Sequence, residues 1–211
     1  MHIKSFTYEN DFELYANTYI VFDDEKNCII IDPSKEDENV IKYIRDAGLL
    51  LRAILLTHGH FDHIRGVDML VNAFNAPVYI HKFDKKLLET PRLNCSDRFS
   101  RKNVIIKSAT NDIEEGMIIN GLSEDVVVSF TPYHTKGSCC FYLKDSKALF
   151  SGDSLFFEGL GRCDLKTSQP SELHNSLEKM LSLPNDTLVY PGHGQSTSIQ
   201  HERYANTIVK R

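Results

Sequence analysis

Three histidines and one aspartate fall within six positions directly after an apolar run, and this segment constrains the fold more than any other. It reads THGHFDH at residues 57–63 and follows the apolar residues 53–56. In a chain with nine histidines, a match to HxHxDH arises by chance in about one chain in a thousand. Imidazole and carboxylate are the groups that zinc and similar divalent ions bind. The sequence therefore predicts a metal site in a loop at the end of a buried strand.

Three more potential ligands stand downstream, each in a glycine-rich turn that follows a short β-like run. They are His134 after residues 126–130, Asp153 after residues 148–150 and His193 after residues 187–189. Loops at the ends of strands are a common place for a rigid sheet to hold a functional group. We therefore expect these turns to lie beside the first histidine cluster in the folded chain.

The hydrophobic pattern alternates between strand-like and helical segments, which predicts an α/β fold with helices covering sheets. One helix is expected from Ser34, with Gly48 as its stop, and others at 67–74, after Pro170 and around 199–209. Strands are predicted at residues 18–22, 28–31, 51–56, 77–80, 104–107, 126–130, 139–143, 148–150 and 187–190.

Residues 82–103 are polar and irregular, and could form a flap over the site. The chain has no short repeat, low-complexity tract or linker rich in Pro, Gly or Ser. A single domain spanning residues 1–211 is therefore expected.

Composition excludes several partners. The net charge of −5 gives no basic footprint for nucleic acid, and no apolar run approaches the roughly 20 residues that span a membrane. The first nine residues lack the apolar stretch of a secretory signal, so a cytoplasmic protein is expected. The five cysteines are odd in number and form no CxxC, which favours reduced thiols. Adjacent Cys139 and Cys140 should face opposite sides of a strand. The sequence does not indicate an oligomeric state.

Over nearly its whole length the chain resembles the metallo-β-lactamase superfamily, and within it the glyoxalase II-like hydrolases. Five motifs carry the resemblance: His58-x-His60-x-Asp62-His63-x-x-Gly66, the TPYHTKGS turn with His134, the Gly-Asp pair with Asp153, Gly159-x-Gly161-Arg162-x-Asp164, and the PGHG turn with His193. One departure is Tyr133, where the family usually has glycine. The resemblance implies a four-layer αβ/βα sandwich, the metallo-β-lactamase fold, with the metal site at one edge of the packed sheets.

Seven donors are too many for one four- or five-coordinate ion but enough for two ions that share a carboxylate. The resemblance assigns His58, His60 and His134 to one ion and Asp62, His63 and His193 to the other, with Asp153 bridging. Zinc is the first expectation for both ions, and iron or manganese also accepts these ligands.

The function implied by the resemblance is hydrolysis of a small-molecule thioester of the S-lactoylglutathione kind by a metal-bridging hydroxide. The chain resembles a short form without the C-terminal helical domain that helps glyoxalase II hold glutathione, so recognition of the thiol would come from elsewhere. A thiolate leaves without a dedicated acid, and no convincing spare acid stands near the motifs.

Three residues have a second interpretation. Asp62 is expected to be a ligand and is also a candidate proton shuttle. Tyr133 either narrows the pocket or offers its phenol to the substrate, or is a tolerated loop aromatic. Arg162 either pairs with a site carboxylate and orients the loop after Asp153, or contacts Asp164 or the backbone to shape that loop.

Other functions remain open at this point. A mononuclear iron persulfide dioxygenase shares the GRxD signature and would use His58, His134 and Asp153, and metal analysis separates it from a two-zinc hydrolase. A non-catalytic metal-binding module is less favoured, because every ligand position holds a competent residue. β-Lactamase activity is not expected, because the best-known zinc lactamases use a different ligand set at the second site.

Overall fold

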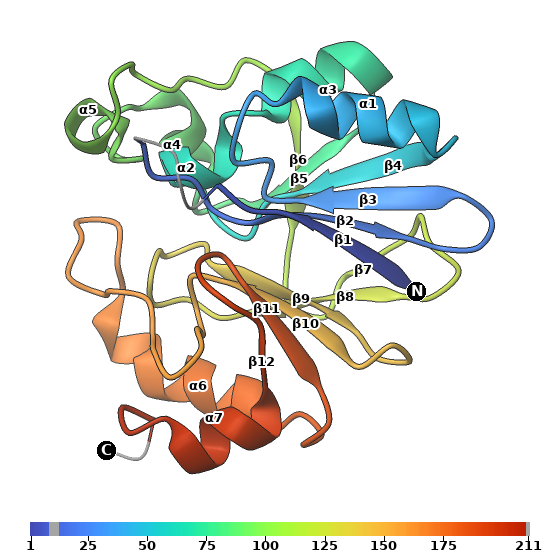
Figure 1. Cartoon of the computed structure of the whole chain (residues 1–211). Helices are drawn as coiled ribbons and strands as arrows, with labels where there is room; N and C mark the ends of the chain where they lie inside the picture. Colours follow the sequence, from blue (N-terminus) through green and yellow to red (C-terminus); the bar gives the residue numbers. More distant parts are fainter. Residues whose placement is uncertain (9–12, 210–211) are drawn as a thin grey trace.

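The computed structural model describes residues 1–8 and 13–209 and contains two packed β-sheets with helices on their outer faces (Figure 1). Within these residues the first sheet has six strands, in the order β1-β2-β3-β4-β5-β6. They are β1 (His2–Phe6), β2 (Thr18–Phe22), β3 (Asn27–Ile31), β4 (Leu50–Leu55), β5 (Val78–His81) and β6 (Thr110–Ile113). Pairing is antiparallel from β1 to β3 and parallel from β3 to β6, so β3, β4 and β5 end at the same edge.

The second sheet also has six strands in the described residues, in the order β12-β11-β10-β9-β8-β7. They are β7 (Ile118–Ile119), β8 (Val126–Phe130), β9 (Cys139–Leu143), β10 (Ala148–Gly152), β11 (Leu188–Pro191) and β12 (Thr197–Ser198). Only β10 and β11 pair in parallel. Their crossover contains a 3₁₀ turn (Pro170–Glu172) and α6 (Leu173–Leu181), and α7 (Ile199–Ala205) follows β12.

Alternation of side chains along the strands creates the layers. In β3, Cys28 and Ile30 pack under α1 (Glu38–Asp46) and α3 (Val67–Phe74), whereas Ile29 and Ile31 lie between the sheets. In β9, Cys139 belongs to the core between the sheets and Cys140 to the core under α6. The opposite orientation expected of these two cysteines is confirmed, and all five cysteines are free thiols.

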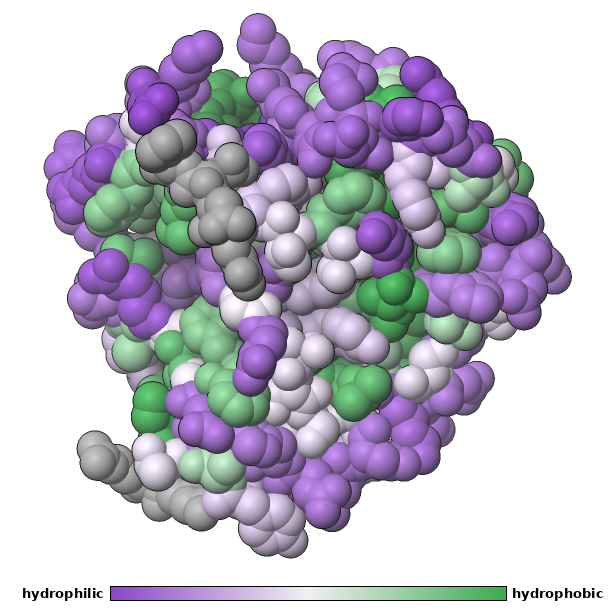
Figure 2. All heavy atoms as spheres, viewed as in Figure 1, coloured by the Kyte–Doolittle hydropathy of each residue, from purple (hydrophilic) through white to green (hydrophobic). Residues whose placement is uncertain are grey.

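Helices therefore cover the outer face of each sheet, and the predicted four-layer αβ/βα sandwich is confirmed. The space-filling view of the same side shows hydrophobic and near-neutral residues across the middle, where the two sheets meet, and hydrophilic residues toward the periphery (Figure 2). No helix in residues 1–8 and 13–209 combines the length and apolar character needed to cross a bilayer.

The first helix begins later than predicted. Its N-cap is Asp37, whose carboxylate accepts a hydrogen bond from the backbone N–H of Asn39. Ser34 is buried instead, and its backbone N–H donates to the hydroxyl of Thr18 at 3.0 Å. This bond fixes residue 34 beside β2 and leaves it outside the helix.

The predicted strand at 104–107 is wrong. The backbone N–H of Ile106 donates to the carbonyl of Leu88, and that of Lys107 donates to the carboxylate of Asp68, so neither joins a sheet. The strand in this region is the more polar β6, which pairs with β5 at an edge.

Besides β6, three short or mostly exposed strands lie outside the predicted set: β1, β7 and β12. The segment 82–103 contains two short helices, α4 (Lys85–Glu89) and α5 (Ser96–Phe99), and the final helix ends at Ala205.

Candidate metal centre

The seven predicted donors lie in loops that follow four different strands. His58 and His60 stand directly after β4, and Asp62 and His63 lie in α2 (Phe61–Ile64), the short helix that continues this loop. The other three follow the second sheet: His134 after β8, Asp153 after β10 and His193 after β11. The structure brings all seven together at one edge of the sandwich.

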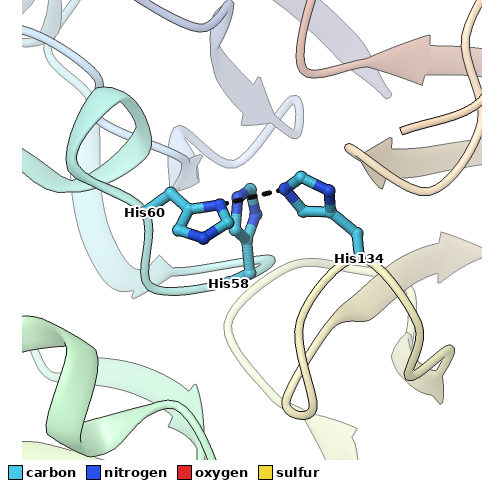
Figure 3. Close-up of side chains that lie close together, drawn as sticks. All are labelled: His58, His60 and His134. Carbon is cyan, nitrogen blue, oxygen red and sulfur yellow. Dashed lines mark hydrogen bonds between the residues drawn. The ribbon is translucent and has the colours of Figure 1, made fainter. Parts of the chain in front are cut away.

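The first cluster consists of His58, His60 and His134, each of which offers one ring nitrogen, and these three atoms lie within 4.8 Å of one another. His60 and His134 point toward each other from opposite loops, with Nδ1 of His60 at 2.9 Å from Nε2 of His134 (Figure 3). The ring of His58 lies edge-on to both, at centroid distances of 4.7 and 4.8 Å. One loop from each sheet contributes to this cluster.

The second cluster consists of Asp62, His63 and His193, again within 4.8 Å of one another. Nε2 of His193 is 3.2 Å from Oδ2 of Asp62, and Nε2 of His63 is 3.9 Å from the same oxygen. This cluster also joins the two sheets, because His193 follows β11 while its two partners follow β4.

Asp153 stands between the clusters. Its Oδ1 lies 3.2 Å from Nε2 of His63 and 3.6 Å from Nε2 of His193, in the second cluster. Its Oδ2 lies 3.5 Å from Nε2 of His134, in the first. One carboxylate thus presents an oxygen to each group of donors.

Three buried atoms in this region make no hydrogen bond of good geometry: Nε2 of His58, and the pair Nε2 of His63 and Oδ1 of Asp153, which lie 3.2 Å apart. A buried polar atom without a partner is costly, and most such atoms in folded proteins are paired. These three are imidazole nitrogens and a carboxylate oxygen, the atoms that bind divalent metals. The site therefore fits metal ions by the chemistry of its unpaired donors.

Burial keeps part of the site neutral. It lowers the pKa of His58 well below the usual value and that of His60 to about 3. A metal binds the unprotonated imidazole, so both rings have the required form at neutral pH.

In the second cluster and at Asp153, neighbouring opposite charges outweigh burial in setting the pKa values. Burial alone would lower the pKa of His63 and His193, but the carboxylate of Asp153 helps raise both. Burial would likewise raise the pKa of Asp153 and Asp62, and the neighbouring histidines lower both instead. In the absence of metal these opposite shifts favour the charged forms of the histidines and of the carboxylates beside them.

Asp32 supports the site and was not singled out from the sequence. Its Oδ2 lies 2.8 Å from Nδ1 of His63 and accepts a 2.6 Å hydrogen bond from the hydroxyl of Thr57. Its other oxygen accepts from the backbone N–H of Thr57. Asp32 directly follows β3, has a left-handed φ of 49° and is buried. A bond to one ring nitrogen fixes which nitrogen faces the metal site.

Asp84 is the second support that sequence reasoning missed. Its buried carboxylate accepts hydrogen bonds from the N–H groups of Gly59 and Gly137 and from the hydroxyl of Thr135. It therefore ties the first histidine loop to the loop that carries His134. The only sequence signal for Asp32 and Asp84 is that each is a polar residue just beyond a parallel strand.

Two glycines permit close approach at the site. A side chain on Gly192 would place its Cβ 2.4 Å from Oδ1 of Asp153 and 2.7 Å from a carbon of the His63 ring. At Gly161 a Cβ would meet the carbonyl of Asp153 at 1.8 Å. The glycines of the PGHG and GLGR turns thus leave room for the donors themselves.

Tyr133 is fully buried and lies outside the lining of the pocket beside the donors. Its hydroxyl donates to the backbone carbonyl of Ser154 and lies 3.3 Å from that of Asp153. Burial raises the pKa of the phenol, which therefore stays protonated. The structure places this side chain under the turn that presents Asp153.

Arg162 has two separate contacts. Its exposed guanidinium forms a two-pronged pair with Asp164, at 2.6 and 2.8 Å. Its backbone carbonyl lies 2.7 Å from Nδ1 of His134 and accepts from it if that nitrogen carries the proton. The main chain at residue 162 thus orients one donor, while the side chain borders the pocket.

A pocket of about 390 Å³ opens beside the donors. His60, Asp62, His134, Asp153 and His193 form its polar side. The rest of the lining is largely apolar and includes Leu14, Phe61, Phe99, Phe156 and Leu165. Cys95 and Phe99, from the segment 82–103, border this pocket, as a flap would.

Comparison with known proteins identifies a matching family model and several similar proteins. The family model described as "Metallo-beta-lactamase superfamily" matches residues 12–193. A probable metallo-hydrolase, YqgX of Bacillus subtilis, is 39% identical over 197 residues, covering 93% of each chain. A hydroxyacylglutathione hydrolase, GloC of Haemophilus influenzae, is 32% identical over 197 residues and 92% of each chain.

Two solved structures are similar along most of their length. The B3 metallo-beta-lactamase BLEG-1 superposes with a TM-score of 0.90 at 32% identity, covering 100% of both chains. TTHA1623, solved in a di-iron-bound form, superposes with a TM-score of 0.82 at 36% identity, covering 92% of this chain and 96% of that one.

Proposed function

The chain belongs to the metallo-β-lactamase superfamily, and from this premise we propose that it is a binuclear metal-dependent hydrolase that cleaves small-molecule thioesters of the glyoxalase II type. The observation that carries the proposal is the position of Asp153, which presents one oxygen to each of two donor clusters. His58, His60 and His134 would hold one ion, and Asp62, His63 and His193 the other. Bound divalent ions supply a hydroxide at neutral pH and neutralise negative charge that develops on the substrate.

The chain's own residues supply binding and shape. The apolar part of the lining, which includes Phe61 and Phe156, offers a surface for an acyl group and keeps bulk water away from it. Asp62 contacts His193 at 3.2 Å, which supports a ligand role and gives no separate evidence for proton transfer.

The residues that line the pocket favour a thiol leaving group. Among residues 1–8 and 13–209, the titratable side chains that line the pocket beyond the metal donors are Cys95 and Arg162. Burial raises the pKa of the Cys95 thiol, and a guanidinium stays protonated, so neither is a good proton donor to a leaving group. A thiol has a pKa near 8.5, so a thiolate leaves without such help far more readily than an alkoxide or an amide anion.

One relative supports the same reaction and another supports the metal count. A hydroxyacylglutathione hydrolase cleaves a thioester, and GloC carries that name at 32% identity. TTHA1623 holds two irons, which favours two metal ions in this chain as well and keeps iron beside zinc and manganese as a choice of metal.

The persulfide dioxygenase alternative explains less of the site. It would use His58, His134 and Asp153 for one iron and leave Asp62, His63 and His193 without a role. The second cluster therefore favours the binuclear hydrolase.

β-Lactam hydrolysis is a second candidate function because of the similarity to BLEG-1 over the whole chain. Although the best-known zinc lactamases use a different ligand set at the second site, in this chain the same seven donors would have to serve this reaction, and the substrate that the pocket accepts would distinguish the two. This candidate is therefore tested in the same assay.

The test combines metal counting with a substrate panel. Anomalous scattering at the zinc and iron edges should show two ions per chain, one in each cluster. The loaded enzyme should hydrolyse S-lactoylglutathione or another thioester, and Asp153→Asn should lose that activity together with at least one ion.

Other outcomes identify the alternatives. One iron per chain with oxygen uptake on glutathione persulfide identifies the dioxygenase, and turnover of a chromogenic cephalosporin alone identifies the lactamase. No turnover of any thioester by fully loaded enzyme would rule out the proposal.

A further inference from the structure

A second, smaller pocket adjoins the metal pocket. It has a volume of about 100 Å³, and Cys95, Phe99, Arg162 and Leu165 line both pockets. Thr167 also lines the smaller one, and its hydroxyl lies 3.4 Å from Nε2 of His60. The smaller pocket therefore begins beside the metal donors and extends away from them along the segment 92–99.

Among the residues that the structure describes, four cationic side chains and no acidic one line this pocket: Arg92, Arg98, Arg162 and Lys166. We call it the basic pocket. Arg162 is paired with Asp164, whereas the other three form no ion pair with an acidic side chain in residues 1–8 and 13–209. The chain as a whole carries a net charge of −5, so this concentration of positive charge is local.

Positive charges that face a common cavity repel one another, and an anion in the cavity relieves that repulsion. Guanidinium groups in addition match the two oxygens of a carboxylate or phosphate with two parallel N–H donors. A volume of about 100 Å³ holds one such group and excludes a whole carrier molecule.

Resting on the thioesterase function proposed above, we propose that the basic pocket binds an anionic group of the substrate's thiol carrier while the thioester lies at the metal donors. The chemistry shared by possible carriers is a carboxylate or phosphate attached to a thiol. The apolar residues that line the larger pocket would then contact the acyl part, and the cationic side chains of the smaller pocket would contact the anionic group of the thiol.

The direct test is binding of free thiols to the metal-loaded protein by calorimetry. Glutathione offers carboxylates, coenzyme A offers phosphates, and N-acetylcysteamine is an uncharged thiol. Contact between sulfur and metal is common to all three probes, so it cancels in the comparison.

The variant Arg98→Gln/Lys166→Gln removes two of the unpaired charges. It should raise the Kd of at least one anionic thiol about tenfold, as expected for losing a charge-assisted contact at a partly exposed site. The matched control, Lys42→Gln/Lys107→Gln, removes the same charge from exposed positions outside both pockets and should leave that Kd unchanged.

The probe that responds identifies the anion. A change for glutathione alone indicates a carboxylate, and a change for coenzyme A alone indicates a phosphate. Equal Kd values in wild type and variant for both anionic thiols would overturn the proposal, as would an equal loss for N-acetylcysteamine.

Turnover gives a second measurement that separates this inference from the proposed function. With thioesters of the same three thiols, the variant should raise KM for the anionic substrate with little effect on kcat, and added salt should raise the wild-type KM more steeply than that of the variant. If the wild type cleaves none of the thioesters, the proposed function fails, while calorimetry still decides whether the basic pocket binds anions.

Discussion

Nδ1 of His63 lies 2.8 Å from Oδ2 of Asp32, and this contact directs the other ring nitrogen toward Asp153. Both side chains are buried, so the contact is shielded from water. The same carboxylate holds Thr57, the residue before the first histidine. One carboxylate thus orients a donor of the second cluster and anchors the loop of the first.

Asp32→Asn should weaken metal binding at the second cluster by about 10- to 100-fold, the usual cost of losing a carboxylate behind a metal-binding histidine. The amide keeps the shape but removes the charge that favours the Nδ1–H form of His63. Titration of metal into the metal-free protein, monitored by calorimetry, measures the effect. Asp68→Asn is the control, because Asp68 also accepts backbone N–H bonds but lies away from the site. Equal loss in both variants would refute a specific role for Asp32.

Gly192→Ala should lower kcat/KM on the thioester substrate by about 100-fold, since displacement of a reacting group by about 1 Å costs that much. The new methyl group overlaps Oδ1 of Asp153 and the ring of His63, so one of them must move. Gly159→Ala serves as the control, because its Cβ would meet no atom closer than 3.6 Å. Full activity of Gly192→Ala would show that the turn can shift without harm.

Tyr133→Phe should destabilise the protein by about 1 kcal/mol and leave KM unchanged. The phenol donates to the carbonyl of Ser154 and does not line the pocket, so its loss affects the turn below Asp153 and not substrate contact. Denaturant unfolding and steady-state kinetics measure the two effects separately. A raised KM with unchanged stability would indicate that the phenol contacts the substrate.

The metal-free protein should be most stable near pH 6.5, the ordinary pKa of histidine. His58 and His60 have lowered pKa values, so the unfolded chain binds their protons better, and stability falls as pH drops below about 6.5 toward the value of about 3 for His60. His63 and His193 have raised pKa values, so their contribution is complete below about 6.5 and is lost as pH rises through the folded-state values.

Thermal unfolding of metal-free protein from acid to alkaline pH measures this profile. His193→Gln should flatten its alkaline side, because that variant cannot carry the charge that Asp153 and Asp62 stabilise. A Tm that climbs steadily through pH 9 in the wild type would contradict the expected sign.

The convergence of the seven candidate donors could be predicted because their sequence signal is local. Each donor follows an apolar run by one to four positions or lies in the dense cluster at 57–63, and the structure places all seven at one edge. Strand ends in a packed sandwich converge, so correct strands were sufficient to bring distant turns together.

The supporting carboxylates were missed for the opposite reason. Asp32 and Asp84 are single acidic residues in ordinary sequence, and their role arises only when β3 and β5 end beside β4. Their partners lie about 25 to 53 positions away along the chain, which no local pattern reveals.

The error at 104–107 has a similar cause. The apolar residues 104–106 favour a strand by composition. The backbone N–H of Val104 instead donates to the hydroxyl of Ser96, that of Ile106 to the carbonyl of Leu88 and that of Lys107 to the carboxylate of Asp68. The edge position beside β5 is occupied by β6, whose polar residues Asn111 and Asp112 are exposed while Ile113 is buried.

Each donor cluster takes residues from both halves of the molecule, with His58 and His60 facing His134, and Asp62 and His63 facing His193. An ion bound in either cluster would link the two sheets where they pack against each other. Neither half alone supplies a complete set of ligands for an ion. Metal binding would therefore require that the two halves be packed together. Removal of the metal by a chelator would then weaken the contact between the two sheets before either sheet unfolds.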